Sequence, residues 1–227
     1  MEISKFLATV PLFNGLTPAQ YDELAMIATL QTVRKGQSVF AEGDPGAGFY
    51  VVASGLIKIY KLSLDGKEQI LHIFGAGEPF AEAAVFTGSS YPAHAMALEE
   101  SRIFFFPRKT FIELIRCNPD LAMNMLAALS MRLKKFAHMI ENLSLKEVPG
   151  RLAAHLLFLS EQQGEADTVA LPVSKTQLAS LLGTIPETLS RILTKLAKQG
   201  IIAMNGAQIT LVDRDSLSDL AAGEKRL

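Results

Sequence analysis

Short apolar segments separated by glycines fill residues 33–106 and predict β-strands. Asp65-Gly66 lies between two of these segments and is a strong signal for a hairpin turn. Many short strands at regular spacing are typical of an antiparallel barrel or jelly roll. Residues 1–30 instead predict one or two short helices, with Thr17 as N-cap and Pro18 in the first turn. The strands are expected at residues 38–41, 49–53, 56–62, 68–74, 94–98 and 102–106.

From residue 120 to residue 144 the apolar positions recur at helical spacing. Successive members are separated by three or four residues in alternation, which is a heptad repeat. This stripe could pack on the chain's own barrel. However, a long helix beside a small barrel can bury one face there and still present a second apolar stripe. We therefore expect a homodimer held by a coiled coil through Leu126, Leu129, Leu133, Phe136, Ile140 and Leu143.

A pair of short helical patterns around Gly183 predicts a helix-turn-helix near the C-terminal end of the chain. The two helices are expected at residues 174–182 and 186–199. An apolar hairpin pattern follows over residues 201–211, with its turn at Asn205-Gly206. A hairpin in this place is the signature of a winged helix-turn-helix.

The second of these helices carries side chains that suit the reading of DNA bases. Glu187, Ser190 and Arg191 are spaced three and four residues apart and share one helical face, with apolar residues opposite. Arg191 can pair with both acceptors of guanine, and Glu187 can accept from cytosine. Ser190 suits thymine or adenine but is weakly selective. Glu187 and Arg191 could instead pair only with each other, but the helix-turn-helix context favours base reading.

Positive charge in this chain is local. The whole chain carries a net charge of −1, whereas residues 174–200 carry a net charge of +3. A modest basic patch therefore lies where a DNA-facing surface is expected. Lys195 and Lys198 can reach phosphates along the second helix. Contacts to the DNA backbone are also expected from residues at the helix starts and the turn, namely Lys175, Thr176, Gln177 and Thr184.

Composition excludes several other classes of protein. The 227 residues, 49% of them hydrophobic, suit one large or two modest domains. No apolar run approaches the roughly 18 residues of a membrane span, and residues 1–6 lack the apolar core of a signal peptide. We therefore expect a cytoplasmic protein with no membrane partner. Paired carboxylates, a metal-spaced histidine cluster, a Ser/His/Asp arrangement and a phosphate-binding loop are all missing, so an enzyme is not expected.

Cysteine content narrows the cofactor chemistry. Cys117 is the only cysteine, so neither an intrachain disulfide nor a four-cysteine iron–sulfur cluster is expected. A plain thiol is the expected state of Cys117.

Several motifs occur together in an order that resembles one family. They are Gly43-Asp44, residues 49–60, residues 65–71, residues 77–83 and residues 142–152. In that order and spacing they resemble the CRP/FNR family of bacterial regulators over essentially the whole chain. The resemblance implies an α+β fold with an N-terminal cyclic-nucleotide-binding-like β-roll, or jelly roll, then a long dimerisation helix and a C-terminal winged helix-turn-helix. It also implies a homodimer that binds double-stranded DNA.

The expected domains follow from this resemblance. Residues 1–118 form the β-roll sensor domain with its N-terminal helices, 119–147 the dimerisation helix, and 148–227 the DNA-binding domain. Pro149-Gly150 breaks the helical pattern and predicts the hinge or domain boundary, ahead of a helix over residues 151–160. An effector bound between the β-roll and the long helix would re-aim the winged domains about this hinge.

The departures from the family pattern concern the effector. Cyclic-nucleotide binders of this family carry an arginine that pairs with the phosphate, and Tyr91 occupies that slot here. A neutral phenol cannot replace a bidentate guanidinium, so cyclic AMP is not expected. Glu82 matches the family's ribose-contacting acid, although it could instead cap local backbone groups. Phe136 and Ala137 replace small hydroxyl residues, so the pocket is expected to be more apolar than a nucleotide needs. The cysteine ligands of the oxygen-sensing branch are missing.

Two segments are similar to particular branches of the family. Residues 80–86 and 186–191 resemble the DNR and HcpR-type regulators, which implies a response to nitric oxide through haem. An apolar pocket fits haem b. His72, on the strand over residues 68–74 that lines the family's effector pocket, is the candidate iron ligand, with His94 and His138 as weaker candidates. Without a CxxCH motif the haem would be non-covalent. His72 could instead be a packed or surface side chain, and a different small organic effector is the alternative.

The predicted base-contacting residues resemble those of the FNR/DNR branch. The Glu-x-x-Ser-Arg spacing at residues 187–191 implies a TTGA-type half-site. Pro186 stands where the cyclic-AMP-receptor branch has an additional arginine. A two-fold dimer requires an inverted repeat with half-site centres roughly one helical turn apart. The surface loop at residues 87–90 is a candidate contact for RNA polymerase.

Overall fold

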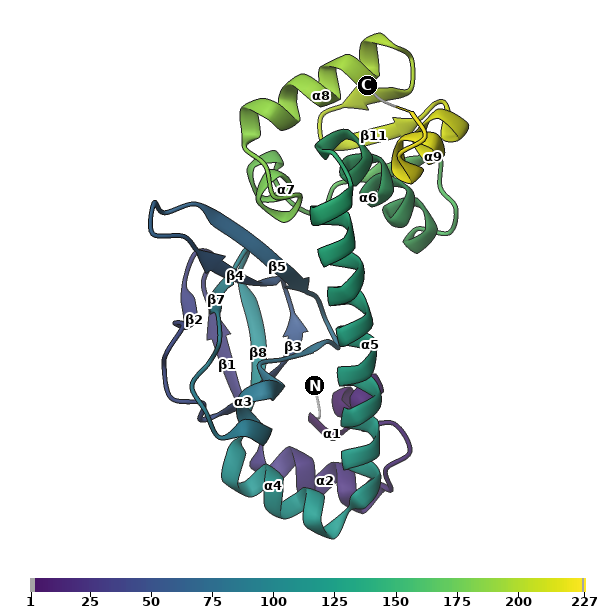
Figure 1. The fold of residues 1–227 in the computed structure, drawn as a ribbon. Helices are drawn as coiled ribbons and strands as arrows, with labels where there is room; N and C mark the ends of the chain where they lie inside the picture. Colours follow the sequence, from purple (N-terminus) through teal and green to yellow (C-terminus); the bar gives the residue numbers. More distant parts are fainter. Residues whose placement is uncertain (1–2, 226) are drawn as a thin grey trace. The chain divides into compact units, whose positions relative to one another are not determined.

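The computed structural model describes residues 3–225 and 227, apart from the side chains of Lys135 and His138. The chain divides into two compact units that meet between Leu133 and Lys134 (Figure 1). Helix α5 (Pro119–Leu145) crosses that boundary, so it contributes residues to both units.

Short helices precede the sheets of the first unit. These are α1 (Ile3–Leu7), a 3₁₀ turn (Pro11–Phe13) and α2 (Pro18–Ile27). The predicted cap of α2 is confirmed. Thr17 Oγ1 accepts from the Gln20 amide at 3.4 Å, and Gln20 Oε1 accepts from the Thr17 amide at 2.7 Å. This reciprocal pair satisfies two donors that a helix start leaves unpaired.

Two four-stranded antiparallel sheets form the β-roll, which confirms the predicted jelly roll. One sheet has the order β1 (Thr29–Val33), β8 (Ser101–Pro107), β3 (Gly48–Ser54) and β6 (Pro79–Phe80). The other has the order β2 (Ser38–Phe40), β7 (His94–Ala97), β4 (Ile57–Leu62) and β5 (Glu68–Phe74). The sequence pattern missed β1 and β6, and the expected helical segment is wrong at its end because β1 begins at Thr29.

Strand β3 shows why the first unit holds two cores. Alternate residues of a strand point to opposite faces. Tyr50 and Val52 join the core between the two sheets, whereas Phe49 and Val51 join the core under the N-terminal helices. Both faces of this strand are therefore buried, which explains its nearly continuous run of apolar residues. The second core also takes Leu121 and Met125 from α5 and Phe111 from α4 (Arg108–Cys117).

The junction between α5 and α6 (Val148–Gln162) differs from the prediction. The helical pattern breaks at Lys146 and Glu147, and Pro149-Gly150 belongs to α6. Pro149 sits in the first turn, where its missing N–H costs no hydrogen bond. The expectation that Pro149-Gly150 interrupts the helix is therefore wrong by about one turn, because a proline that can end one helix can equally begin the next.

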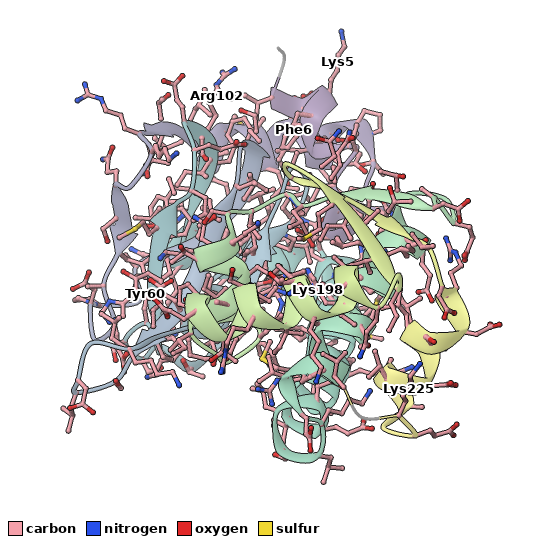
Figure 2. All side chains as sticks on the ribbon, turned by 90° about the horizontal axis from the view of Figure 1, so that it is seen from above. Lys5, Phe6, Tyr60, Arg102, Lys198 and Lys225 are labelled. Carbon is pink, nitrogen blue, oxygen red and sulfur yellow. The ribbon has the colours of Figure 1, made fainter. Side chains whose placement is uncertain are left out.

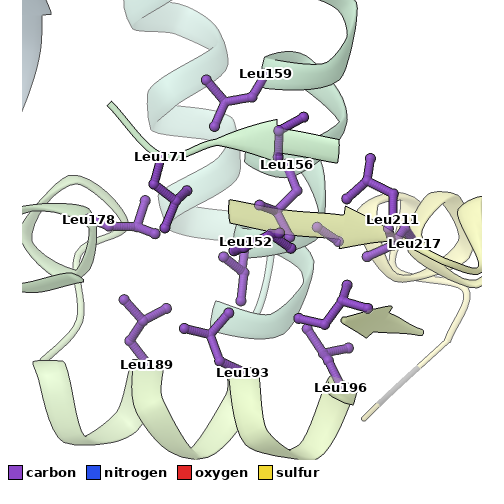
Figure 3. Close-up of a cluster of buried hydrophobic side chains, with 14 of the residues drawn as sticks. Leu152, Leu156, Leu159, Leu171, Leu178, Leu189, Leu193, Leu196, Leu211 and Leu217 are labelled. Atoms are coloured by element: carbon purple, nitrogen blue, oxygen red, sulfur yellow. The ribbon is translucent and has the colours of Figure 1, made fainter. Parts of the chain in front are cut away.

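The second unit is a winged helix-turn-helix. Its elements after α6 are β9 (Thr168–Ala170), α7 (Lys175–Leu181), α8 (Pro186–Lys198), β10 (Ile202–Asn205), β11 (Gln208–Leu211) and α9 (Arg214–Ala222). The three strands form one antiparallel sheet in the order β10, β11, β9. Leucines from α6, α7, α8, β11 and α9 converge in a single core (Figure 3).

Candidate nucleic-acid interface and effector site

Helix α8 is amphipathic, and its apolar face fixes its position. Leu189, Leu193 and Leu196 are buried, and they point into the leucine core of the second unit (Figure 3). Their spacing of four and three residues keeps them on one side of the helix. The opposite side is therefore directed away from the core.

The opposite face of α8 carries the predicted base-reading residues. Glu187, Ser190 and Arg191 are exposed, and they line an open hollow of about 430 Å³ together with Thr194, Lys195 and Lys198. Lys198 is labelled on α8 in Figure 2. In the part of the chain that the structure describes, Glu187 and Arg191 form no ion pair with each other or with any other residue. The carboxylate and the guanidinium are therefore available to an external partner.

The start of α7 and the turn show what the predicted backbone-contacting residues do. Ser174 Oγ accepts from the Gln177 amide at 3.2 Å, and Gln177 Oε1 accepts from the Ser174 amide at 2.8 Å. This capping box commits one side-chain atom of Gln177 to the fold. Lys175 and Thr176 are exposed, whereas Gln177 and Thr184 are partly buried. Gly183 has a φ of 66°, the left-handed conformation that glycine adopts without strain.

The wing between β10 and β11 carries no charge. Its turn is Asn205-Gly206, with the φ of Gly206 at 63°, and residues 202–211 hold no acidic or basic side chain. The wing therefore adds no positive charge to that of Lys175 on α7 and of Arg191, Lys195 and Lys198 on α8.

Tyr91, which occupies the family's phosphate-arginine slot, is a packed core residue. Its hydroxyl donates to the Gly48 carbonyl at 2.9 Å and accepts from the Gly48 amide at 3.3 Å. Its ring stacks on Phe40, with 3.9 Å between centroids. Burial raises the pKa of Tyr91 above its usual value. The phenol is therefore neutral, and both hydrogen-bonding roles of its oxygen are already used inside the β-roll.

Glu82 is buried and pairs with a residue that the sequence pattern did not single out. Arg132 of α5 donates to Glu82 Oε2 through Nη1 and to the Pro79 carbonyl through Nη2 at 2.7 Å. The guanidinium carbon lies 4.9 Å from the Phe74 ring centroid. The contact spans fifty positions in sequence, so no local pattern could have revealed it. Among the described contacts, Glu82 does not cap local backbone groups.

The backbone in front of Glu82 is strained. Ala81 has a φ of 67°, a conformation that residues other than glycine rarely adopt. The chain turns there into α3 (Glu82–Thr87), whose first residue is the buried carboxylate. The strained turn therefore fixes where this carboxylate meets Arg132.

His72 lies on β5, two residues before Phe74. Its ring meets Phe74 edge-on, with 4.5 Å between centroids. Its Nε2 is 4.0 Å from Glu78 Oε1, which is beyond hydrogen-bond distance. His94 is engaged, since its Nδ1 accepts from the Glu42 amide at 3.1 Å. The side chain of His138 lies outside the described residues. His72 is thus the better placed of the two described candidates for binding a metal.

The predicted dimer stripe on α5 is largely uncovered. Leu126, Leu133 and Ile140 are 56%, 70% and 64% exposed, and Phe136 is 36% exposed. Leu129 and Leu143 are partly buried, and Ala137 is exposed. In contrast, Leu121 and Met125 are fully packed within the first unit. Phe136 and Ala137 belong to the second unit, whereas His72, Glu82 and Tyr91 belong to the first.

Comparisons with known proteins agree with this architecture. A cyclic nucleotide-binding domain model matches residues 30–118, and a Crp-like helix-turn-helix domain model matches residues 150–220. The cyclic AMP receptor protein of Thermus thermophilus is 32% identical over 94% of this chain and 97% of its own length. The fumarate and nitrate reduction regulatory protein of Escherichia coli is 33% identical, over 86% and 80%. The structure of FixK2 from Bradyrhizobium japonicum is 28% identical, with a TM-score of 0.76 over 86% of this chain and 97% of that chain.

The fold and these relatives define a DNA-binding transcriptional regulator rather than an enzyme. The chain belongs to the CRP/FNR family, whose regulators bind DNA and act as dimers. Within the described residues, no helix is both long enough and apolar enough to cross a membrane.

Proposed function

We propose that this protein is an effector-gated regulator that acts in the cytoplasm and binds an inverted TTGA-type repeat as a homodimer. One observation carries the DNA part of the proposal. Glu187 and Arg191 stand exposed on one face of α8 and lack an internal partner in the described structure. Exposed, unpaired groups of opposite charge at this spacing match the acceptors of guanine and the donor of cytosine.

The exposed stripe on α5 supports the dimer. A soluble monomer rarely leaves several large apolar side chains exposed in one row, and Leu126, Leu133 and Ile140 are each more than half exposed. Packing the stripe against its copy would bury them. A two-fold axis along α5 would then present two copies of α8, which is the reason to expect an inverted repeat.

Binding to synthetic DNA tests this function. Fluorescence anisotropy would compare an inverted TTGA-type repeat with the same duplex in which both half-sites are scrambled. The wild-type chain is expected to prefer the repeat by at least about a thousandfold. A Glu187→Ala and Arg191→Ala double variant is expected to bind both duplexes alike. Equal binding of the wild-type chain to both duplexes, both with and without haem and nitric oxide, would overturn the proposal.

For the effector, we propose haem b with His72 as an iron ligand and nitric oxide as the signal. The support is the position of His72, whose ring lies edge-on to Phe74 beside an aromatic cluster that includes Phe80, with its Nε2 4.0 Å from the Glu78 carboxylate. Residues 80–86 and 186–191 also resemble the DNR and HcpR-type branches of the family. When bound, the haem iron would supply the site to which nitric oxide coordinates. The chain itself would hold the group through His72 and surround it with apolar side chains.

A haem titration tests this effector. The purified chain is expected to develop a Soret band that saturates at one haem per chain, shifts with nitric oxide and is altered by His72→Ala. His94→Ala, which removes the engaged histidine, serves as the matched control. No saturable band would exclude haem and leave the DNA-binding function intact.

A small organic effector without haem is the second candidate. The observation in its favour is the Glu82–Arg132 pair, because a ligand with a polar group could exchange with either partner. Cyclic AMP is a poor candidate, since Tyr91 supplies no cation and its hydroxyl is already satisfied. Calorimetric titration of metabolite mixtures, with Arg132→Gln as control, would detect such a ligand.

The loop at residues 87–90 is proposed as a contact for RNA polymerase. It is exposed, and the hydroxyls of Thr87 and Ser89 lie within hydrogen-bond distance of each other, at 2.6 Å. Replacing Ser89 and Ser90 with alanine is expected to lower transcription in vitro without changing affinity for DNA. Unchanged transcription would remove the loop from the proposal.

A further inference from the structure

Arg151 joins the end of the long helix to the DNA-binding domain. It lies in the first turn of α6, and its Nη1 donates to the Lys146 carbonyl at 2.9 Å and to the Leu143 carbonyl at 3.4 Å. The last carbonyls of a helix have no partner within it, and a cation there is favoured by the helix dipole. One side chain therefore caps α5 from the helix that follows. All of these residues belong to the second unit.

The bend that Arg151 spans has little freedom. Pro149 cannot donate to the Leu145 carbonyl, and its ring would clash there, so α5 and α6 cannot merge into one straight helix. On the other side of α6, Gly150 lies against α9. A Cβ at position 150 would be 2.7 Å from the Leu220 carbonyl oxygen, closer than real contacts allow. The start of α6 is thus held by α9 on one face and by Arg151 against α5 on another.

The arginine is placed there at an energetic cost. Its Nε is buried and has no hydrogen-bond partner among the described residues, and burial lowers the pKa of its guanidinium. A partly buried cation with an unsatisfied donor is weak evidence for stability. A residue retained under these conditions is better explained by the geometry that it fixes.

We infer that Arg151 is a positioning residue that fixes the angle between α5 and the DNA-binding domain, and so sets the spacing between half-sites that the dimer accepts. This inference rests on the proposed function, because it needs a dimer with α5 along its axis and one α8 in each half-site. Each base pair inserted between half-sites moves them about 3.4 Å apart and rotates one about the duplex axis. A dimer with a fixed bend rejects that change, whereas a dimer with a loose bend tolerates it.

The test compares two DNA duplexes and four full-length proteins. One duplex carries the preferred inverted repeat, and the other has one additional base pair between the half-sites. The proteins are wild type, Arg151→Met, Arg151→Lys and Arg214→Met. Arg214 is the matched control, because it bonds to Ser160, Ala166 and Asp167 within the same domain and does not contact the end of α5.

The readout is the ratio of the two dissociation constants. Wild type is expected to prefer the correct spacing by about tenfold or more. Arg151→Met should reduce the ratio to about twofold or less, mostly through weaker binding to the preferred repeat. The ratio for Arg151→Lys should lie between these two values, because an ammonium keeps the positive charge but not the planar set of N–H donors of a guanidinium. Arg214→Met should change both constants alike and keep the ratio.

Each outcome decides a separate question. A wild-type ratio in Arg151→Met overturns the inference. If Arg151→Met does not fold, Arg151→Lys carries the test, and an unchanged ratio in that variant has the same meaning. If wild type binds both repeats no more tightly than the scrambled duplex that tests the proposed function, the proposed function itself fails, and the inference falls with it.

Discussion

The candidate sites of the two units treat their charged side chains in opposite ways. In the DNA-binding unit, Glu187 and Arg191 are exposed on α8 and unpaired within the described structure. In the β-roll unit, Glu82 pairs with Arg132, Lys58 pairs with Glu68, and Tyr91 is hydrogen-bonded to Gly48. The candidate site in the β-roll is thus internally satisfied, whereas the exposed face of α8 is left for an external partner.

This difference explains why one function is easier to infer than the other. A polyanion can bind α8 without breaking any internal contact. An effector that reaches Glu82 must instead replace the hydrogen bonds of Arg132, so only a ligand with differential affinity for the opened arrangement can shift the equilibrium. The effector can therefore be inferred only from the internal hydrogen bonds that it would replace. The DNA sequence can be inferred from the side chains that are exposed on α8.

Removing the internal partner in the β-roll should have the largest effect. Arg132→Met leaves the Glu82 carboxylate buried and unpaired, so the free energy of unfolding should fall by about 3 kcal/mol. The double variant Glu82→Leu and Arg132→Met should recover most of this loss. Urea unfolding followed by circular dichroism measures both, since the chain has no tryptophan. A loss below about 0.5 kcal/mol is typical of surface sites, and it would show that the Glu82–Arg132 pair contributes no more than an exposed ion pair.

Removing a group from the exposed face of α8 should affect binding rather than folding. Arg191→Ala should weaken binding to the inverted repeat by about 1–3 kcal/mol and relax discrimination at one guanine. Stability should stay near wild type because the Arg191 side chain is exposed and makes no ion pair or hydrogen bond among the described residues. Anisotropy with single-base variants of the repeat measures this, with exposed Arg102→Ala in the β-roll as control. Equal weakening on every sequence would contradict base reading.

A buried histidine in the DNA-binding unit gives a pH dependence. Burial lowers the pKa of His155 to about 4, and its Nε2 has no hydrogen-bond partner among the described residues. In the unfolded chain His155 is protonated below about pH 6.5, whereas in the folded chain it stays neutral until the pH falls to about 4. Stability should therefore fall by about 2 kcal/mol between pH 7 and pH 5 from this group alone.

Replacing the histidine should remove that dependence. In His155→Leu the free energy of unfolding should change less with pH, by the same amount of about 2 kcal/mol. The titration of His155 in the folded chain, followed by nuclear magnetic resonance, gives the pKa directly. A midpoint near 6.5 would mean that the imidazole is solvated.

The smallest effect is expected at Tyr91. Tyr91→Phe removes the hydroxyl that bonds to both backbone groups of Gly48 and should cost about 1 kcal/mol. Thermal unfolding compares it with Tyr60→Phe, a matched tyrosine for which no hydroxyl hydrogen bond is described. If both variants have the same melting temperature as wild type, Tyr91 contributes only its ring.

Much of this fold follows from local patterns in the sequence. The hairpin at Asp65-Gly66, the cap at Thr17 and the amphipathic α8 each depend on neighbours within a few residues. Strand β1 lacks such signals, because it is mostly exposed and shows no apolar alternation. Helix α9 has them, with Asp213 as N-cap and Gly223 at its C-terminus, but its short polar sequence predicts no helix by apolar periodicity.

The candidate sites divide in the same way. Glu187, Ser190 and Arg191 lie on a single helix, so their spacing alone predicts that they share one face. The partner of Glu82 comes from α5 and the partner of Tyr91 from β3, far away in sequence, and only the fold brings them together. The helix break near Pro149 was placed about one turn too late, because the sequence does not tell whether a proline ends a helix or begins one.

The central claim is that α8 reads DNA sequence as part of a two-fold dimer. Selection of binding sites from a randomised duplex library by the full-length chain tests it most directly. An enriched inverted repeat with TTGA-type half-sites, which disappears when Glu187 and Arg191 are both replaced by alanine, is the expected result. Enrichment of no repeat, or of the same repeat by the double variant, would contradict the claim.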